Sequence, residues 1–429
     1  MNVSIASQAG STVRPAQAGV RRVPGQALFW AFQSYVVIAV ACSSFFPILF
    51  RYQEHAVIIL SVLCLGMCWL ERVNPWIKTP LDLPLWLFIT WVLCTVPFAT
   101  DPSYSFAEWK KFVAQAVVFY WVQLVLHRCR REHLPQQILW SLTLGASILA
   151  LYALVEFVDR GGTWKDRNIR AHAFGSDYNW LNTYMVMTLP ILLTMLLIFR
   201  ERRVRIVGGL ALGLGVLAQV ASYTRAGWLG HVVQLGTYGF ISGHRRVVVV
   251  MAGIVAVASL AFVVIPKTGH QVDTVDPWTL EARAAVWKLG LKDIREHPLV
   301  GVGYGNDTFI KRHREYSPAA QAEKKERERV LPAMHSTFLM IALGSGVPAF
   351  IFFLWTFVTI IRVLIPFPWS PQMSDGVVLV TGVGIAVVGF VTRNLFDYMF
   401  AGSLAHLFWI LVAVGVTVRS ADRQRLAAG

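Results

Sequence analysis

The chain has 429 residues, of which 55% are hydrophobic and only 15% are charged. A soluble domain carries about 25% charged residues, so this composition excludes an ordinary soluble protein and indicates a polytopic membrane protein. The formal net charge of +15 is compatible with nucleic-acid binding, but the basic residues lie in short clusters between apolar runs. Such clusters are typical of a membrane topology signal, and we expect no nucleic-acid partner.

Apolar runs long enough to cross a bilayer recur along the chain. Isolated segments in lipid satisfy their backbone groups only as helices. The predicted fold class is therefore an all-α polytopic membrane protein with about 12 transmembrane helices and one large external helical loop. The predicted spans cover residues 27–50, 56–71, 83–99, 112–126, 136–158, 180–199, 204–222, 225–242, 247–265, 336–364, 376–392 and 397–418.

The loops between these runs alternate in charge. Basic clusters such as "ERVNPWIK", "HRCRREH" and "RERRVR" fall on one side, which the positive-inside rule makes cytoplasmic. An even number of spans then puts both termini in the cytoplasm. The predicted organisation is a cytoplasmic tail over 1–26, nine transmembrane helices over 27–265, an external loop over 266–334, three further transmembrane helices over 335–418 and a cytoplasmic tail over 419–429.

The external loop is the only sizeable soluble part that the sequence predicts. It contains the amphipathic pattern "WTLEARAAVWKLGLKDIREH", the glycine-rich turn "GVGYGN" and the charged helical stretch "PAAQAEKKERERV". We expect this loop to lie on the membrane domain as a lid. The cytoplasmic loops are too short for a nucleotide-binding domain, and the sequence contains no P-loop, no CxxC and no DxD motif. We therefore predict external chemistry with no cofactor and no metal site.

Several external arginines lie close to predicted helix ends in apolar surroundings. Arg225 is the clearest, because it stands where two spans meet with almost no loop. A charge at membrane depth costs about 2.5–3.5 kcal/mol on insertion scales, so it usually faces a polar cavity or a partner. One interpretation is arginines that reach lipid headgroups; the other is a guanidinium cluster for a phosphate-bearing ligand. The candidates are Arg51, Arg170, Arg225, Arg283 and Arg393.

His335 stands between the charged stretch and a long apolar helix, followed by Ser336. An imidazole works as a general base near neutral pH. The positive end of the helix and nearby arginines would keep the ring neutral. The alternative is a histidine that caps the helix or packs at an interface. Asn179 is a lower-ranked candidate for substrate contact, and we expect it or Asp177 to cap the helix that begins near Trp180.

Four stretches together resemble the O-antigen ligase superfamily, which also contains O-antigen polymerases and protein O-oligosaccharyltransferases. They are "RAHAFGSDYNWLNTYM", "SYTRAGWLG", the segment from "EARAAVWKLG" to "GVGYGNDTF", and "HSTFLMIALGSG". The first carries Arg170 and Asn179, although Asp-Tyr replaces the Asn-Pro usual in the family. The second carries Arg225 and the third Arg283, while the fourth has the ligase pattern of a His, a Ser, nine further residues and then a Gly.

The resemblance implies an inverting, metal-independent glycosyltransferase with its active site at the periplasmic face of the bacterial inner membrane. A glycan would move from undecaprenyl pyrophosphate to lipid A–core oligosaccharide. His335 would be the catalytic base, and Arg170, Arg225 and Arg283 would bind the pyrophosphate. Arg51, Arg393, Asn179 and Ser336 are further substrate-binding candidates.

Two alternatives stay open. Within the superfamily, the chain could be a polymerase or a protein O-oligosaccharyltransferase. From a different class, about twelve spans also suit a lipid or polysaccharide transporter, for which inverted repeats would be expected. The sequence shows no convincing internal repeat, and its arginines gather at one face instead of at mid-depth.

Overall fold

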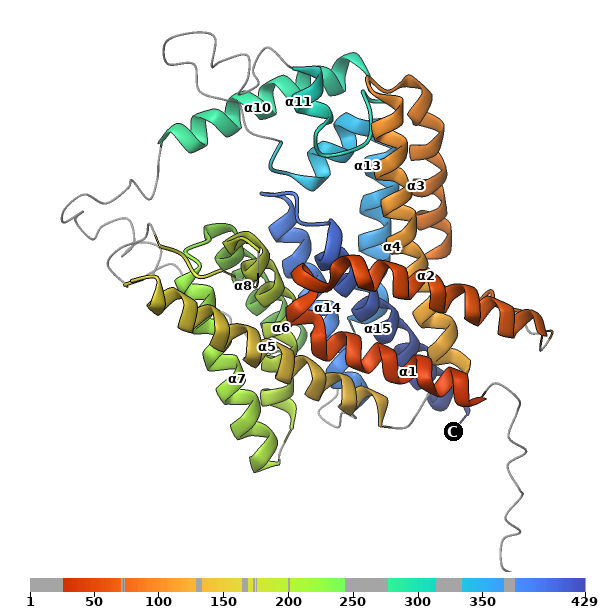
Figure 1. Ribbon diagram of the computed structural model, residues 1–429, viewed down its shortest axis with the longest axis vertical. Helices are drawn as coiled ribbons and strands as arrows, with labels where there is room; N and C mark the ends of the chain where they lie inside the picture. Colours follow the sequence, from red (N-terminus) through yellow and green to blue (C-terminus); the bar gives the residue numbers. More distant parts are fainter. Residues whose placement is uncertain are drawn as a thin grey trace, which may run out of the picture.

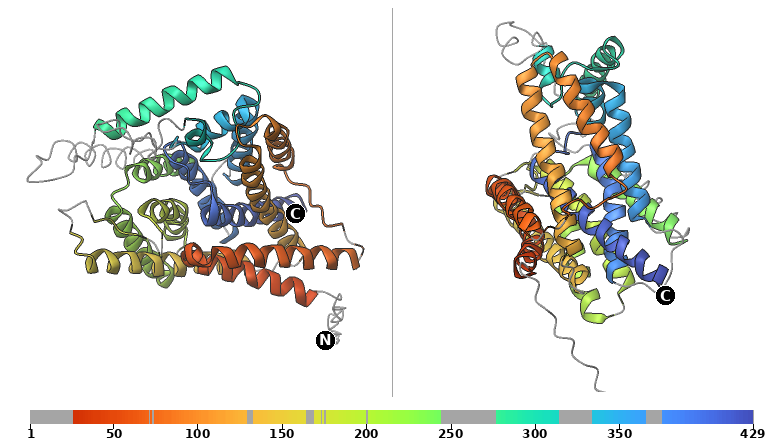
Figure 2. Two further views of the ribbon diagram at one scale, coloured as in Figure 1. Left: turned by 45° about the horizontal axis from the view of Figure 1, so that its top comes forward. Right: turned by 90° about the vertical axis from the view of Figure 1, so that its right-hand side faces the viewer.

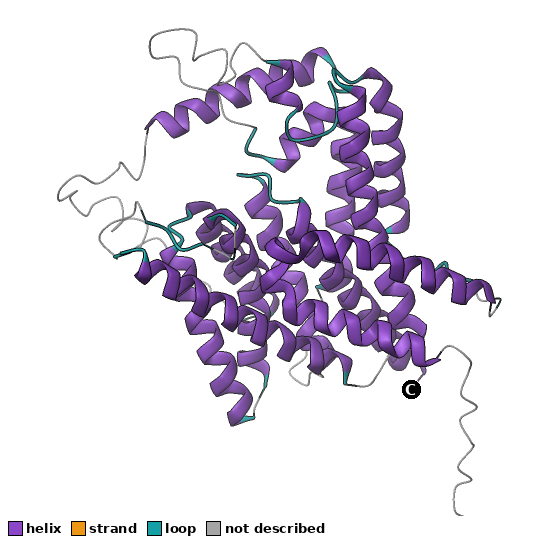
Figure 3. Ribbon diagram, viewed as in Figure 1, coloured by secondary structure: helices purple, strands orange, loops and turns teal. Residues whose placement is uncertain are grey.

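A computed structural model describes residues 26–70, 72, 74–128, 133–163, 169–172, 174, 176–199, 201–243, 277–313, 334–365 and 375–428. Throughout these residues the regular structure is helical, without a strand (Figures 1 and 3). The helices are α1 Gln26–Ala41, η1 Cys42–Phe45, α2 Phe46–Leu70, α3 Asp82–Thr95, η2 Val96–Phe98, α4 Pro102–Arg128, α5 Leu134–Asp159, α6 Tyr178–Ile198, α7 Arg202–Ala221, α8 Arg225–Ile241, α10 Pro277–Glu296, α11 Thr308–Arg312, α13 Thr337–Leu364, α14 Asp375–Asn394 and α15 Gly402–Ala428.

Six of the described helices contain segments long and apolar enough to cross a membrane, which makes the chain a multi-pass membrane protein. The segments are Leu134–Asp159, Tyr178–Ile198, Arg202–Ala221, Thr337–Leu364, Gly376–Asn394 and Gly402–Ala421. The all-helical class is therefore confirmed, whereas the count of about twelve spans stays a prediction. The predicted span 247–265 and the charged stretch near 318–330 lie outside the described residues.

Most predicted spans coincide with helices, but the first two are divided differently. The sequence analysis places a loop at 51–55, whereas α2 runs through these positions and holds Arg51 in its second turn. The helix instead breaks earlier, at η1, where two serines follow Cys42. The stretch "RYQEH" is polar but contains no glycine or proline, so it lowers the hydropathy without ending the helix.

Helix α14 lies inside the bundle, where it packs against α6, α8, α13 and α15. An aromatic cluster fills the space where α13, α14 and α15 meet. Phe400, which precedes α15, is central to it: its ring lies 5.2 Å from Phe408, 5.6 Å from Phe353 and 5.7 Å from Phe390, measured between ring centroids. Edge-to-face pairs at these distances are favourable, so Phe400 anchors the loop between α14 and α15.

The amphipathic stretch predicted in the large loop forms α10, which lies with α11 at one end of the molecule (Figure 1). The C-terminal end of α15 lies at the opposite end (Figure 2). The segment after α10 is fastened to the start of α4. Thr100 donates its backbone N–H to the Val302 carbonyl at 2.8 Å, and Lys311 forms an ion pair with Asp101 at 2.7 Å. The described part of the loop, residues 277–313, therefore contacts the helical bundle, and its role as a lid stays a prediction.

The lid and α13 meet where α13 is broken. Ser345 and Gly346 have non-helical backbone angles inside this helix, so the carbonyls before the break are free for other partners. The Leu343 carbonyl accepts from Val302 N–H at 2.9 Å, and the Gly344 carbonyl accepts from Gly303 N–H at 2.8 Å.

Gly346 has φ +82°, and a Cβ atom there would overlap the Leu299 backbone. Only glycine satisfies both conditions without strain. The glycine of the His-Ser-x9-Gly pattern therefore permits the lid to contact α13.

Candidate functional site

His335 immediately precedes the cap of α13 and has an unusual backbone. Its φ of +45° lies in the left-handed region, which costs a side-chain-bearing residue about 1–2 kcal/mol. Ser336 is the N-cap, and its hydroxyl accepts from Leu339 N–H at 3.3 Å. The serine of the pattern thus caps the helix, while the strained residue before it projects the imidazole.

The imidazole of His335 faces a carboxylate that the sequence analysis did not identify. Nδ1 of His335 lies 3.2 Å from Oδ1 of Asp397, in the loop between α14 and α15. Burial alone would raise the pKa of Asp397, but the hydrogen bond with His335 and the charge of Arg393 outweigh it and lower the pKa to about 2. Asp397 is therefore ionised at neutral pH.

The ionised Asp397 decides the tautomer of a neutral His335. A carboxylate only accepts hydrogen bonds, so Nδ1 must carry the hydrogen. The lone pair then lies on Nε2, at the other side of the ring. The side chain of His335 is 32% exposed, so this nitrogen can meet a substrate. A histidine held in this way can accept a proton.

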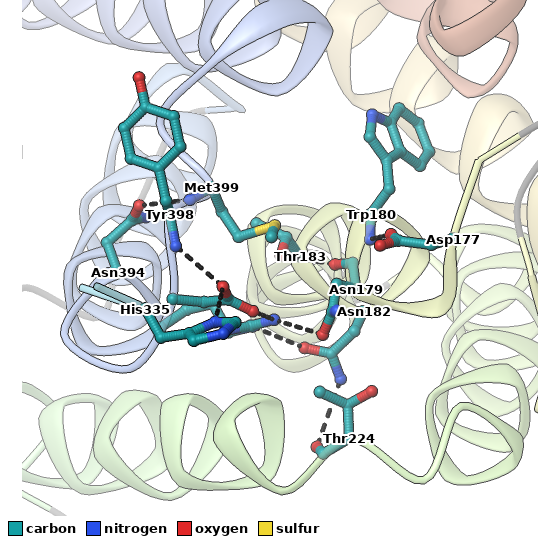
Figure 4. Close-up of polar contacts among 12 residues, drawn as sticks. Asp177, Asn179, Trp180, Asn182, Thr183, Thr224, His335, Asn394, Tyr398 and Met399 are labelled. Atoms are coloured by element: carbon teal, nitrogen blue, oxygen red, sulfur yellow. Dashed lines mark hydrogen bonds and ion pairs between the residues drawn. The ribbon is translucent and has the colours of Figure 1, made fainter. Parts of the chain in front are cut away.

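Arg393 supports Asp397 from the last turn of α14. Its Nη2 donates to Oδ2 of Asp397 at 3.0 Å and to Oδ1 of Asn179 at 2.9 Å, and its Nε donates to Oδ1 of Asn182 at 3.2 Å. Figure 4 labels the two asparagines and His335 in this network. The residue is 1% exposed. Since its donors face protein acceptors, the guanidinium holds α6, α14 and the Asp397 loop together.

The loop that carries Asp397 is also bound to the start of α13. Thr337 donates its backbone N–H to the Asp397 carbonyl at 3.2 Å and its hydroxyl to Oδ1 of Asn394 at 2.7 Å. The same Asn394 oxygen accepts from Met399 N–H at 3.1 Å. Thr337 follows His335 by two residues, and Asn394 and Met399 flank Asp397 in the sequence. These contacts therefore hold the start of α13 at a fixed distance from the Asp397 loop.

The chain segments that carry Arg170 and Arg225 contact the first turns of α6. The same turns contain Asn179 and Asn182, which accept from Arg393. The Arg170 guanidinium lies 4.4 Å from the ring centroid of Tyr178, the first residue of α6. Ala171 N–H donates to the Ala221 carbonyl at 2.9 Å, which joins this segment to the end of α7. Arg225 is exposed at the first position of α8.

The α7–α8 turn reaches the same network through Asn182. Its Nδ2 lies 3.4 Å from Ser222 Oγ and 3.5 Å from the Thr224 carbonyl. Asp177 caps α6 by accepting from Trp180 N–H at 2.9 Å, so the cap is Asp177 and not Asn179. The structure therefore brings the segments of Arg170, Arg225, Arg393 and Asn179 to one network with His335.

For two other candidates from the sequence, the structure describes the backbone alone. Arg283 lies in α10 and Arg51 in α2, but their side chains are outside the described part. Asp397 and Asn182 were missed. A signal existed for Asp397, because it follows Arg393 by four residues where a span ends, and opposite charges at this spacing pair readily. Within the described ranges, no group of three or more His, Cys, Asp and Glu residues could hold a metal ion.

The fold and the site together define a multi-pass helical membrane protein with a histidine–aspartate pair beside a buried arginine. A family model described as O-antigen ligase matches residues 210–354, a segment that includes α10 and His335, and this match supports membership of the O-antigen ligase family. No curated protein matches the chain. The matched family points to a glycosyltransferase-like enzyme with lipid-linked glycan substrates.

Proposed function

We propose that the chain is an O-antigen ligase, which transfers a glycan from undecaprenyl pyrophosphate to lipid A–core oligosaccharide in lipopolysaccharide biosynthesis. The observation that carries the proposal is the His335–Asp397 pair, at 3.2 Å, with His335 inside the family-matched region. A transfer to a sugar hydroxyl needs a base, and the imidazole of this pair is 32% exposed.

The reaction needs one bond to form and one to break. The acceptor hydroxyl oxygen attacks the anomeric carbon, while the bond from that carbon to the pyrophosphate oxygen breaks. The hydroxyl proton passes to Nε2 of His335, and undecaprenyl pyrophosphate leaves with the bonding electrons. Attack from the side opposite the leaving group, with no covalent enzyme intermediate, inverts the anomeric configuration. Asp397 stabilises the imidazolium that forms and keeps the ring oriented.

The leaving pyrophosphate would be neutralised by arginines, without a metal. Arg225 is exposed and lies at the positive end of α8, which favours an anion through charge and helix dipole together. Arg170 from the segment before α6 and Arg283 from the lid complete the proposed site. Fixed guanidinium groups suit pyrophosphate because of their bidentate geometry.

Three lower-ranked candidates receive positioning roles in this proposal. The sequence analysis considered Arg393, Asn179 and Ser336 as substrate contacts. Arg393 is 1% exposed and bound to Asp397 and to two asparagines. Ser336 is 2% exposed and caps α13. Groups buried in this way orient their neighbours, so we assign Arg393 and Ser336 to the support of His335. Asn179, which is partly exposed, joins them because it accepts from Arg393.

The proposal places this site at the periplasmic face of the bacterial inner membrane. About twelve spans with both termini in the cytoplasm follow from the alternation of loop charge. In support, α10 lies at the end of the bundle opposite the C-terminal end of α15 (Figure 1). The lid and the arginines would then be periplasmic, where lipid-linked glycan and lipid A–core are both present.

The test is transfer with purified components: lipid-linked glycan, lipid A–core, chelator and no nucleotide. We expect ligated product from the wild-type chain and none from His335→Ala at equal protein level. Product from His335→Ala would overturn the base assignment, and a requirement for divalent metal would overturn the arginine mechanism.

Extension of the glycan on its carrier would indicate a polymerase, and transfer to an added protein would indicate a protein O-oligosaccharyltransferase. Movement of intact lipid across vesicles, without transfer, would indicate a transporter.

A further inference from the structure

The strained backbone at His335 needs a constraint on each side. A left-handed residue relaxes unless its neighbours hold it in place. On the C-terminal side, Thr337 N–H is bound to the Asp397 carbonyl at 3.2 Å. On the N-terminal side, the neighbour is Met334, which is 1% exposed.

Met334 is held by the lid helix. The indole Nε1–H of Trp287 in α10 donates to the Met334 carbonyl at 2.8 Å. Three residues later in the same helix, Gly290 lies against the methionine: a Cβ atom there would come within 2.5 Å of Cε and 2.7 Å of Sδ. Residues three apart share one helix face. The same face of α10 therefore contacts both the carbonyl and the side chain of the residue before His335.

We infer that Trp287 is a positioning residue for His335. By holding the Met334 carbonyl, its indole N–H fixes the peptide plane that leads into His335 and so maintains the left-handed backbone that points the imidazole at Asp397. Without this bond, the chain before His335 can rotate toward an unstrained conformation and carry the ring away from the carboxylate.

The inference also connects the base to the donor, and this part rests on the proposed function. Arg283 stands four residues before Trp287, so the two positions share one face of α10. A helix that binds pyrophosphate through Arg283 would at the same time hold His335 through Trp287.

The kinetic test uses Trp287→Phe, which removes the N–H but keeps an aromatic ring. Trp109→Phe is the matched control, because the Trp109 indole also donates to a backbone carbonyl, that of Ile89, at 2.9 Å. We expect Trp287→Phe to lower kcat about five- to tenfold, the size of one neutral hydrogen bond, with little change in the KM for donor. Its effect should also be less than additive with that of Asp397→Asn, since both act through the orientation of His335. Full additivity, or equal kcat losses in the two phenylalanine variants, would overturn the inference.

A second measurement does not depend on activity. Hydrogen exchange of the folded variants should show faster exchange over residues 334–340 in Trp287→Phe than in wild type, with α6 unchanged. In the wild-type protein, mild denaturant should release the protection of α10 and of 334–340 together. If 334–340 stays protected after α10 has exchanged, Trp287 does not position His335. Coupled exchange in a protein without transfer activity would instead retain the inference and reject the proposed function.

Discussion

Nη2 of Arg393 lies 3.0 Å from Oδ2 of Asp397, so a fully buried guanidinium neutralises the carboxylate that holds His335. Each of these two buried charges is stabilised by the other. Removing the arginine would leave the buried Asp397 without this cation, and removing the carboxylate would deprive the buried Arg393 of this anion. The base is thus oriented by a charge pair whose stability depends on α6 and α14 packing together.

We predict that Arg393→Ala destabilises the protein by about 3–5 kcal/mol, the cost of breaking a buried ion pair, and abolishes transfer. The control is Arg160→Ala, because Arg160 and Glu156 also stand four residues apart but the Arg160 side chain is 45% exposed. That exposed pair should contribute at most about 1 kcal/mol. Denaturant unfolding in mild detergent measures both variants, and similar losses would contradict a structural role for Arg393.

The acid dependence of stability should include a contribution from Asp397. Its pKa of about 2 lies below the ordinary value near 4. A lowered pKa stabilises the folded state above the ordinary value, and this stability is lost as the pH falls toward 2. Wild type should therefore lose about 2 kcal/mol more than Asp397→Asn between pH 5 and pH 2.

Unfolding measured across this pH range checks the prediction. Parallel curves for wild type and Asp397→Asn would show that the carboxylate is not stabilised in the folded state. Because Asp397 remains ionised above pH 4, Asp397→Asn should lower transfer activity throughout the neutral range, with no recovery at any pH above 5.

Gly346→Ala should separate the lid from α13. The added methyl group would overlap the Leu299 backbone, and alanine would have to adopt φ +82°. We expect at least a tenfold loss of transfer together with faster proteolysis within 277–313. Gly213→Ala in α7 is the control, because a Cβ atom there meets nothing within 4 Å. Helix propensity makes that change neutral or stabilising by up to about 1 kcal/mol, and undiminished activity in Gly346→Ala would contradict the contact.

Arg225→Lys should lose most of its activity, although the charge is kept. Lysine lacks the bidentate fork that holds two pyrophosphate oxygens, so the KM for donor should rise and kcat should fall. Arg202→Lys at the start of α7, an exposed arginine on a predicted cytoplasmic loop, is the control and should behave as wild type. Near-normal turnover by Arg225→Lys would assign this arginine to topology or lipid contact.

Hydropathy predicted most of the fold because each span is a local pattern. The predicted spans 180–199 and 204–222 differ from α6 and α7 by at most two residues at each end. The same measure failed at Arg51, where polarity lowered the hydropathy inside a continuous helix. Hydropathy reports the cost of contact with lipid, whereas a helix ends only where the backbone conformation changes.

The site was predictable only in part, because its contacts join distant segments. His335 and Arg225 were identified from local position, but the partner of His335 lies 62 residues further on, at Asp397. Arg393 was recognised as unusual, yet its burial depends on Asn179 and Asn182 from α6. No local pattern reveals that three helices converge there.

The His335–Asp397 contact limits which segments can be exchanged between related proteins. The family-matched segment ends at residue 354, before α14 and the loop that carries Asp397. A chimera that receives this segment alone would combine one protein's histidine with another protein's aspartate, arginine and asparagines. The residues of this site therefore come from separate segments of the chain. A functional chimera must include the first turns of α6 and residues 393–399 together with the matched segment.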